Sequence, residues 1–370
     1  DKLITPYVKK DGSLSKRGLT EEEYSNCLWF GNTEPFMRKK LVEFNLGSRK
    51  QIGEYLIDFG WKPNRFTPTG QSIVDEGTLK KITHIKEAKL IADFLLFQKR
   101  LAQVKSWVDS IKKDGRVHGA VISTGAITGR MAHRNPNVAQ VPGVYSPFGT
   151  ECRECWTVDE GNKLVGIDAS GLELRMLAHY MANKEYTNEI INGDVHSSNQ
   201  KLAGLKSRNQ AKTFIYALLY GAGNQKLGEI VGKGMREGKR LRNLFMTKLP
   251  AFQKLIDAVQ RSVATTNAIK TVDGRMITVR SQRSSLNLLI QSAGSIIMKQ
   301  AAVCFRQDAR HPYEMHANVH DEVQFSCLEE HADDLGNDFC NAIKKAGKTL
   351  NLKVPFEGDF KVGKNWKETH

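Results

Sequence analysis

Three short segments of this sequence carry the residues whose types and spacing could do chemistry. The first runs from Asp168 to Arg175 and reads Asp-Ala-Ser-Gly-Leu-Glu-Leu-Arg, and the third is Val319-His-Asp-Glu322. Each offers a carboxylate beside an apolar run that is typical of a strand, with Asp321 in the turn of a hairpin. Two such carboxylates can hold divalent ions like Mg²⁺, which prefers hard oxygen ligands. A single Asp after a strand is structurally ordinary, so the pair gains meaning only from its surroundings.

The second segment is a predicted helix that lines up cations and aromatic rings. Its residues recur every fourth position and therefore lie on one slanted stripe: Arg208, Lys212, Tyr216 and Tyr220. The two cations could hold phosphates, and the two rings could face a sugar and a base. An ordinary amphipathic helix with exposed cations and core aromatics explains the stripe equally well when it is taken alone. Beside the paired carboxylates, a nucleoside triphosphate site is favoured, and the combination indicates template-directed nucleotidyl transfer.

Strands and helices predicted along the chain place these segments. A buried strand at 164–167 ends at Asp168, helices dominate 172–267, and Asp273-Gly274 is a hairpin turn. A long helix follows over 283–307, and strands at 317–319 and 323–325 meet at a tight turn. The mixture predicts an α+β fold.

The N-terminal part of the sequence predicts a mostly helical module. Residues 1–40 are basic and turn-rich, typical of exposed loops. A helix is predicted from the N-cap Ser48 to Gly60, and a longer one over 86–111. The side chains expected to point inward from the longer helix are Leu90, Phe94, Phe97, Leu101 and Val104. Residues 117–128 alternate weakly, as a strand pair would.

Composition restricts the class of protein. Among 370 residues, 55 Lys and Arg face 40 Asp and Glu, a formal charge of +15. That surplus is expected of a nucleic-acid binder, although a merely basic soluble protein has it too. The six cysteines include a lone Cys152-x-x-Cys155, which favours ordinary thiols over a four-ligand zinc site. No signal peptide and no stretch of about 20 apolar residues predicts membrane insertion.

The three segments closely resemble the motifs of the family A DNA polymerases, and the ending Gly363-Lys-Asn-Trp366 resembles the replicative polymerases of short-tailed phages in particular. Further matches are Thr128-Gly-Arg130, Gly193-Asp-Val-His196 and Arg283-x3-Asn287-x3-Gln291. The resemblance covers roughly residues 40–370. It implies a right-hand polymerase of thumb, palm with antiparallel sheet, and helical fingers. The expected divisions are 1–116 (partial thumb with the basic segment), 117–184 (first part of the palm), 185–272 (fingers) and 273–370 (second part of the palm).

The same resemblance implies roles for individual residues. Asp168 and Asp321 would be the catalytic metal ligands, with the carbonyl of Ala169 adding a third oxygen to two Mg²⁺ ions, for which Mn²⁺ could substitute. Glu173 would be the steric gate that excludes a ribose 2′-hydroxyl, hydrogen-bonded to Tyr220. The expected dNTP-binding residues are Arg208, Lys212, Tyr216, Glu173, His196 and Tyr220. The expected primer and template contacts are Arg130, His320, Glu322, Arg283, Asn287 and Gln291, with Glu322 supporting the site rather than ligating metal.

The resemblance also implies partners. A primed DNA template and dNTPs would be bound, and no membrane would be involved. Many bacterial relatives have Phe where this chain has Tyr216, and the Tyr would let the site accept dideoxynucleotides. A docking site for a processivity factor in residues 1–40 is left open. The expected location is the cytoplasm, of the host if the protein is phage-encoded. The sequence holds no Asp-x-Glu motif, so we expect no proofreading exonuclease in this chain, either by nature or because a preceding part is missing.

Three alternatives were weighed against a DNA polymerase. A single-subunit RNA polymerase shares the carboxylates and a similar helix. Glu173 argues against an RNA polymerase, because the equivalent site of such an enzyme must admit a ribose 2′-hydroxyl. A catalytically dead DNA-binding module would have no reason to keep Asp168, Asp321, Arg208 and Lys212 together. A nuclease also uses paired carboxylates but has no need of a triphosphate-binding helix.

Overall fold

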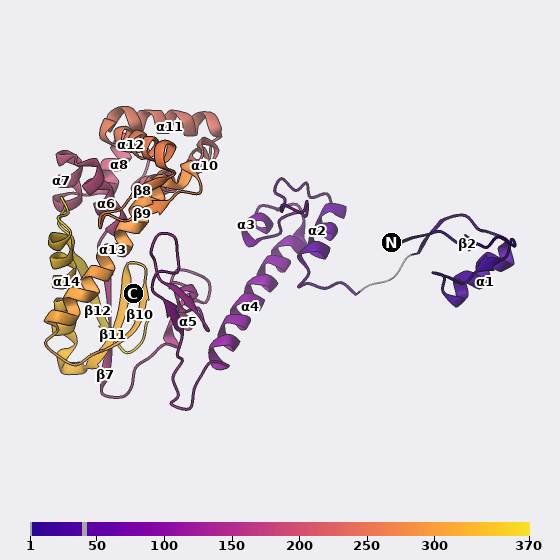
Figure 1. Cartoon of the computed structure of the whole chain (residues 1–370), viewed down its shortest axis with the longest axis horizontal. Helices are drawn as coiled ribbons and strands as arrows, with labels where there is room; N and C mark the ends of the chain where they lie inside the picture. Colours follow the sequence, from indigo (N-terminus) through magenta and orange to yellow (C-terminus); the bar gives the residue numbers. More distant parts are fainter. Residues whose placement is uncertain (1, 39–42) are drawn as a thin grey trace. The chain divides into compact units, whose positions relative to one another are not determined.

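The structure is a computed structural model that describes residues 2–38 and 43–370. It divides into two compact units, residues 1–103 and residues 104–370, which are described separately. Figure 1 shows the helices and strands of both.

The first unit contains small antiparallel pairs and four helices, the last of which runs on into the second unit. Its elements are β1 (Lys2–Ile4), β2 (Tyr7–Val8), β3 (Leu14–Ser15), α1 (Glu21–Phe30), β4 (Phe36–Arg38), α2 (Arg49–Asp58), α3 (Glu76–Leu79) and α4 (Lys86–Val108). Strand β1 pairs with β4, and β2 pairs with β3. Ser48 caps α2 as predicted, since its side chain accepts a hydrogen bond from the Gln51 amide at 3.3 Å. The core consists of Ile52 and Leu56 from α2 packed with apolar residues of α3 and α4.

Two predictions for the first unit were wrong. Residues 21–30 form a helix rather than a loop, because Thr20 and Glu23 make a capping box, a signal that the sequence contains. Residues 1, 39 and 40 of the predicted loop segment lie outside the described residues. The other error concerns the long helix: Leu90 and Leu101 are 68% and 70% exposed.

The buried face of α4 differs from the predicted one because the helix carries two apolar stripes. Ala88, Ile91 and Ala92 are buried at spacings of three and four residues, and they pack with α2. The stripe expected to be buried is mainly outside: Phe97 and Val104 are also exposed and Phe94 is half-buried. Periodicity alone gives both stripes the same weight, so it could not choose between them.

Four antiparallel strands form the sheet at the centre of the second unit. Their order is β10 (Glu314–Val319), β11 (Glu322–Leu328), β7 (Asn162–Ala169) and β12 (Gly358–Gly363). The predicted strand ending near Asp168 and the predicted hairpin around residues 320–321 are both present. The register places Asp168 of β7 between Glu322 of β11 and Asp359 of β12.

Alternation along these strands separates an apolar face from a polar one. Val165 and Ile167 of β7, like Val323 and Phe325 of β11, belong to the main hydrophobic core. On that face, Phe325 lies 5.1 Å from the ring of Phe305 on α13 (Ser285–Asp308) and 5.2 Å from Phe339 on α14 (Ala332–Thr349). The two helices lie together beside the sheet in Figure 1. Asp168, with its cross-strand partners Glu322 and Asp359, is therefore on the other face.

Helices dominate the rest of the second unit, as predicted for residues 172–267. They are α5 (Gly149–Glu154), α6 (Leu172–Met181), α7 (Lys184–Asn192), α8 (Val195–Ala203), α9 (Arg208–Leu219), α10 (Asn224–Glu229), α11 (Met235–Lys248) and α12 (Pro250–Thr266). Two small antiparallel pairs complete it: β5 (Ala120–Ile122) with β6 (Ala132–Arg134), and β8 (Ala268–Lys270) with β9 (Met276–Thr278). The β8–β9 turn contains Gly274 at φ +88°, which confirms the predicted hairpin. The predicted division into thumb, palm and fingers stays a prediction.

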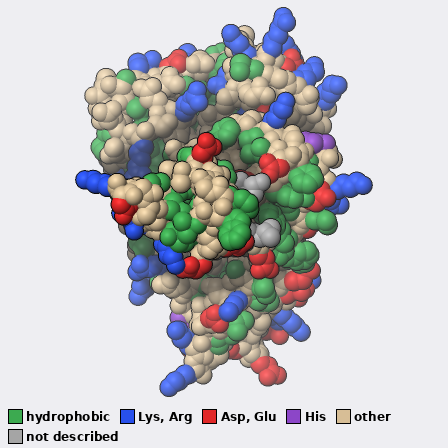
Figure 2. Space-filling view, turned by 90° about the vertical axis from the view of Figure 1, so that its right-hand side faces the viewer, with side chains coloured by type: hydrophobic (Ala, Val, Ile, Leu, Met, Phe, Trp, Pro, Cys, Tyr) green, Lys and Arg blue, Asp and Glu red, His purple; other side chains and the backbone are tan. Residues whose placement is uncertain are grey.

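One apolar helix needs comment. Among the described residues, Gln282–Asp308 is long and apolar enough to cross a membrane, which the sequence reading had not noticed, yet 72% of its most apolar window is buried inside the protein. Its side chains are used for packing against α6, α12 and α14. On the surface, Trp29 and Phe30 at the end of α1 are 86% and 75% exposed. Figure 2 shows hydrophobic side chains exposed on the surface and Lys and Arg side chains that project from it.

Candidate active site

Carboxylates converge at one end of the central sheet. Asp168 is the penultimate residue of β7, and Asp321 occupies the turn between β10 and β11. The amide of Ala169 donates a hydrogen bond to the carbonyl of Asp321 at 3.0 Å, which ties the two chain segments together. Because Glu322 and Asp359 are the cross-strand partners of Asp168, four acidic residues share this end of the sheet.

The negative charges in this cluster are not balanced. The pKa of Asp168 is raised to about 7, first by burial and then by the charges of Asp321 and Glu322. Asp359 raises it further, and His370 alone acts in the opposite direction. Asp168 is therefore hard to ionise beside the other carboxylates. A divalent cation bound here would stabilise its charged form.

Glu322 is held differently from the two aspartates. Its carboxylate is buried and accepts hydrogen bonds from the Trp366 indole and, at 2.7 Å, from the Gln324 amide. His370 lies 3.0 Å and Arg153 3.7 Å from its oxygens. Burial opposes ionisation, yet these partners keep the pKa of Glu322 below its usual value. The carboxylate is thus fully engaged by protein groups, as the expected supporting role requires, while its expected contact with DNA stays a prediction.

The last residues of the sequence complete this network, and sequence reasoning missed them. Thr369 donates to the side chain of Gln324 at 2.9 Å, and the Arg153 guanidinium lies over the Trp366 ring at 4.6 Å. Gly166 has no side chain because one would collide with Gln324 and with the backbone of Thr369. Gly363-Lys-Asn-Trp366 was noticed only as a family likeness. No local sequence pattern around Trp366 indicates that its indole would contact Glu322.

Arg175 fixes the turn that follows Asp168. Its guanidinium donates to the carbonyls of Ser170 and Pro355 at 2.9 and 2.6 Å, and to the Glu357 carboxylate at 2.8 Å. The side chain is 7% exposed. Ser170 in turn donates to Asp359 at 2.6 Å. The Arg at the end of the first motif therefore acts on the backbone, a role that its spacing did not reveal.

The predicted stripe on α9 is present beside the buried side of the helix. Ser207 caps the helix, and Phe214, Ile215 and Leu218 form its buried side. Arg208 and Lys212 are exposed, whereas Tyr216 is half-buried and packs against the main hydrophobic core. The ordinary amphipathic interpretation therefore accounts for Tyr216, but not for the ring of Tyr220, which is exposed at the end of the helix.

Arg208 is joined to the segment around His196. Its Nε and Nη2 atoms donate to the two oxygens of Asp194 at 2.7 and 3.2 Å, and this pairing pulls the pKa of Asp194 well below its usual range. The ring of His196 lies 6.4 Å from that of Tyr216. Burial, followed by the charges of Arg208 and Lys212, lowers the pKa of His196. Its Nδ1 atom is buried without a hydrogen-bond partner.

Glu173 connects three elements of the site. It lies in the first turn of α6 with a side chain 10% exposed. Tyr220 at the end of α9 donates to it at 2.9 Å, which is the hydrogen bond expected from the sequence, and Arg130 donates to its other oxygen at 3.2 Å. The pKa of Tyr216 is raised to about 12 by burial and then by the charges of Glu173, Asp321 and Asp168. The rings of Tyr216 and Tyr220 are 6.3 Å apart, which places Tyr216 next to the hydrogen-bonded pair of Tyr220 and Glu173.

The remaining predicted residues lie on α13 and in the 320–321 turn. Arg283 is exposed just before α13, and Asn287 and Gln291 are half-buried along its first turns. The Asn287 side-chain oxygen is buried without a partner, as a group waiting for a ligand would be. His320 adopts a left-handed backbone with φ +65°. Burial and the charge of Arg130 lower its pKa.

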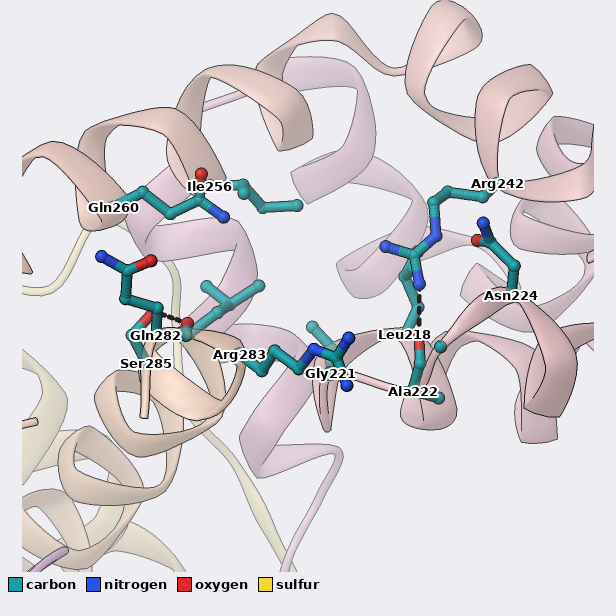
Figure 3. Close-up of a pocket in the computed structure, with 13 residues that line it drawn as sticks. Leu218, Gly221, Ala222, Asn224, Arg242, Ile256, Gln260, Gln282, Arg283 and Ser285 are labelled. Atoms are coloured by element: carbon teal, nitrogen blue, oxygen red, sulfur yellow. Dashed lines mark hydrogen bonds between the residues drawn. The ribbon is translucent and has the colours of Figure 1, made fainter. Parts of the chain in front are cut away.

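A cavity of about 280 Å³ opens where α9 ends against the start of α13 (Figure 3). Arg242 of α11 and Arg283 project toward it, and no acidic side chain lines it in the described part of the chain. Arg242 donates to the carbonyl of Ala222, while its Nε atom is buried without a partner. Gly221 lies at φ +73°, and a side chain there would collide with the backbone of Arg283.

Comparisons with known proteins agree with this arrangement. The family model described as DNA polymerase family A matches residues 32–368. The chain is 38% identical to the DNA-directed DNA polymerase of Enterobacteria phage T3 and 37% identical to that of Escherichia phage T7. Each match covers 91% of this chain and 54% of the relative, so the chain spans about half the length of these curated relatives. DNA polymerase I of Helicobacter pylori strain J99 is 26% identical over 88% of the chain and 38% of its own length.

A solved structure shows the same fold. It is the POL domain of Pol1 from M. smegmatis, in complex with DNA primer-template and dNTP. The TM-score is 0.78 at 24% identity, over 88% of this chain and 62% of that one. The α+β polymerase fold predicted from the sequence is thereby confirmed. The family match spans nearly the whole sequence, and the chain belongs to DNA polymerase family A.

Proposed function

We propose that this chain extends the 3′ end of a DNA primer with dNTPs under the direction of a template strand. The observation that carries the proposal is a chain of contacts from the cations of α9 to Glu173. Arg208 pairs with Asp194, two residues before His196, and the rings of His196, Tyr216 and Tyr220 follow one another at 6.4 and 6.3 Å. Tyr220 then donates to Glu173, which comes five residues after Asp168. A triphosphate held along the α9 stripe would have its reacting end beside Asp168 and Asp321. The phage relatives are DNA-directed DNA polymerases, which supports the same activity for this chain.

Two divalent ions, Mg²⁺ or in its place Mn²⁺, fit the carboxylate end of the sheet. Burial, followed by the charges of Asp321 and Glu322, raises the pKa of Asp168, and a cation beside it would stabilise its ionised form. Asp168, Asp321 and the carbonyl of Ala169 would hold the ions. The described residues contain no group of three His, Cys, Asp or Glu side chains arranged for a metal, which suits Mg²⁺ because it commonly takes one or two carboxylates plus substrate phosphates. When bound, such ions make the primer hydroxyl more acidic and stabilise the leaving pyrophosphate.

The chain's own residues would bind and orient the nucleotide. Arg208 would leave Asp194 and bind the triphosphate instead. Lys212 would bind the triphosphate as a second cation, and His196 would donate a hydrogen bond to it. Tyr216 and Tyr220 would face the sugar and the base. Glu173 is fixed from both sides by Arg130 and Tyr220, so its carboxylate cannot easily move away from a 2′-hydroxyl. That rigidity is what a gate selecting deoxyribose needs.

Primer and template would be contacted from the other side of the site. Arg130, Asn287 and Gln291 would donate to minor-groove acceptors shared by all correct pairs, which checks pair shape rather than sequence. His320 would lie at the primer end. Arg283 would meet the template strand beside the cavity of Figure 3. Three further hypotheses rest on the family resemblance alone. They are a processivity factor bound to residues 1–40, a lack of proofreading, and a location in the cytoplasm, of the host if the protein is phage-encoded.

Primer extension tests the proposal. A primed template is incubated with Mg²⁺ and the chain, with dNTPs and NTPs in parallel reactions. Templated extension with dNTPs alone is expected, and it should disappear with Asp168→Asn or Asp321→Asn while DNA binding persists. Extension with NTPs would instead indicate an RNA polymerase. DNA degradation without extension would indicate a nuclease, and tight salt-sensitive binding without any reaction would indicate a dead module.

A further inference from the structure

A lysine outside the three motifs holds the loop that carries Arg130. Lys299 lies on α13, and its Nζ atom donates to the carbonyl oxygens of Ser123 and Gly129, both at 2.6 Å. These two carbonyls are the two sides of the loop between β5 and β6. One ammonium group therefore closes the loop from the helix side.

Apart from the contacts of Lys299, local hydrogen bonds hold the backbone of the loop. The pair of strands at its base, β5 and β6, is only three residues long on each side. Within it, the Gly129 amide donates to Ala126 at 2.8 Å, and the Ala126 amide donates to Arg130 at 3.2 Å. Gly129 has φ +76°, which glycine adopts without strain, and this conformation sets the direction in which Arg130 leaves the loop. The hydrogen bond from Lys299 anchors the carbonyl of Gly129 to α13.

The burial of an ammonium group here has a physical cost. Burial and then the charge of Arg275 lower the pKa of Lys299, and no ion pair is formed by Lys299 among the described residues. Two short hydrogen bonds to carbonyls compensate for the lost water. In the described part of the chain, the partners of Lys299 are thus two backbone carbonyls of one loop and no carboxylate. This arrangement is expected of a lysine that holds a loop in place.

We propose that Lys299 is a positioning residue for sugar selection. By holding the 123–129 loop, it sets the guanidinium of Arg130, which at 3.2 Å fixes one oxygen of Glu173 while Tyr220 fixes the other. The inference rests on the proposed function of Glu173 as the gate. Its consequence is that the same lysine links the primer end, where Arg130 would make its contact, to the choice between dNTP and NTP.

The test compares Lys299→Met with Arg130→Ala, the double variant, and Lys348→Met as a matched control at an exposed lysine of α14. The measurement is the ratio of kcat/KM for a dNTP to that for the matching NTP. Lys299→Met is expected to lower this ratio about five- to tenfold, because a loosened Arg130 frees the Glu173 carboxylate. Lys348→Met should leave the ratio unchanged. Lys299→Arg, which can also donate to two carbonyls, should restore most of it.

The double variant decides whether Lys299 acts through Arg130. If it does, Lys299→Met changes the ratio no further once Arg130 is alanine; independent, multiplying effects would overturn the proposal. An equal loss of rate with both nucleotides would reduce Lys299 to a structural residue. A lower salt dependence of DNA binding in Lys299→Met would assign it to a phosphate contact instead.

Hydrogen exchange separates this inference from the proposed function. Amides of residues 123–130 should exchange faster in Lys299→Met than in the parent chain, and unchanged protection would overturn the clamp. This measurement needs no catalysis, so it still reads out if the parent chain extends no primer. If Lys299→Met does not fold, Lys299→Gln, which keeps an uncharged donor, is measured in its place.

Discussion

The carboxylate end of the sheet and the stripe on α9 are built in opposite ways. At the sheet, Asp168 lies between two paired strands and Glu322 is enclosed by protein partners. On α9, Arg208 and Lys212 are exposed, and Arg208 pairs with the half-buried residue Asp194. The first region is held by strand pairing and by hydrogen bonds to its carboxylates. Under the proposed function, the second would exchange a partner when the nucleotide binds.

This difference predicts how strongly a substitution in each region should affect activity. A charge cluster whose members are fixed by paired strands and hydrogen bonds responds strongly to loss of one member, because its neighbours cannot rearrange. An exposed ion pair contributes about 0–1 kcal/mol, so its replacement tunes binding without abolishing it. The variants below test this contrast.

Asp168→Asn should have the largest effect. We expect primer extension to fall by about 10³-fold or more, because one of the two groups proposed to hold the ions loses its charge. DNA affinity should change little, since backbone contacts are made by cations elsewhere. The measurement is single-turnover extension alongside DNA binding. Near-normal extension would remove Asp168 from the catalytic role.

The same variant should be more stable than the parent when metal is chelated. The folded-state pKa of Asp168, about 7, lies above its ordinary value of 3.8, so above pH 4 the ionised group opposes folding. Asn removes that penalty, and thermal unfolding at pH 8 in EDTA should show a gain that shrinks as the pH falls below 7. Because Asp168 is exposed, solvent screening limits the gain to about 1 kcal/mol. Asp58→Asn, at an exposed end of α2, is the control and should change nothing. Equal stability of both variants would contradict the charge imbalance.

Trp366→Phe should have an intermediate effect. It removes the indole N–H that donates to Glu322 while keeping a ring under Arg153. We expect a loss of about 1–3 kcal/mol in stability and roughly tenfold in kcat, with KM for dNTP unchanged, because the turn bearing Asp321 loses one support. Urea unfolding and steady-state kinetics measure the two. A change in KM alone would place Trp366 in nucleotide binding instead.

Asp194→Asn should have a smaller effect, in the opposite direction. Without the carboxylate, Arg208 no longer has to exchange a partner, and the KM for dNTP should fall up to about fivefold. The gain should shrink at high salt, which screens the exposed pair. Glu237→Gln, which breaks a similar exposed pair with Arg240 on α11, is the matched control. A raised KM would mean that Asp194 orients Arg208 for the nucleotide.

The same contrast explains what could be predicted from the sequence. The strand before Asp168, the stripe on α9 and the hairpin around Asp321 follow from short-range periodicity and were found. The supports were not found, because Arg175, Lys299 and Trp366 act on groups that are distant in the sequence and follow no local pattern. Long-range contacts of this kind become visible only once the strands are paired.

The buried face of α4 marks a second limit. Two apolar stripes on one helix satisfy the same periodicity, and the buried one is the stripe of Ala88 and Ala92, which shares a hydrophobic cluster with α2. Nothing in the spacing of Leu90 and Leu101 indicates that they would be exposed. Pattern alone therefore predicts a helix well and its orientation poorly.

The smallest expected effect is a pH dependence at His196, and it tests the exchangeable region most directly. Burial and the charges of Arg208 and Lys212 lower its pKa below 6.5, so the free protein holds it neutral near pH 7. A bound triphosphate would compensate those cations and raise the pKa, which makes binding take up a proton. Affinity for dNTP should therefore rise about two- to threefold as the pH falls below 6.5. Because the triphosphate itself also takes up protons, His196→Gln is titrated in parallel; the extra rise should vanish in that variant, and identical pH profiles would show that His196 stays neutral in the complex.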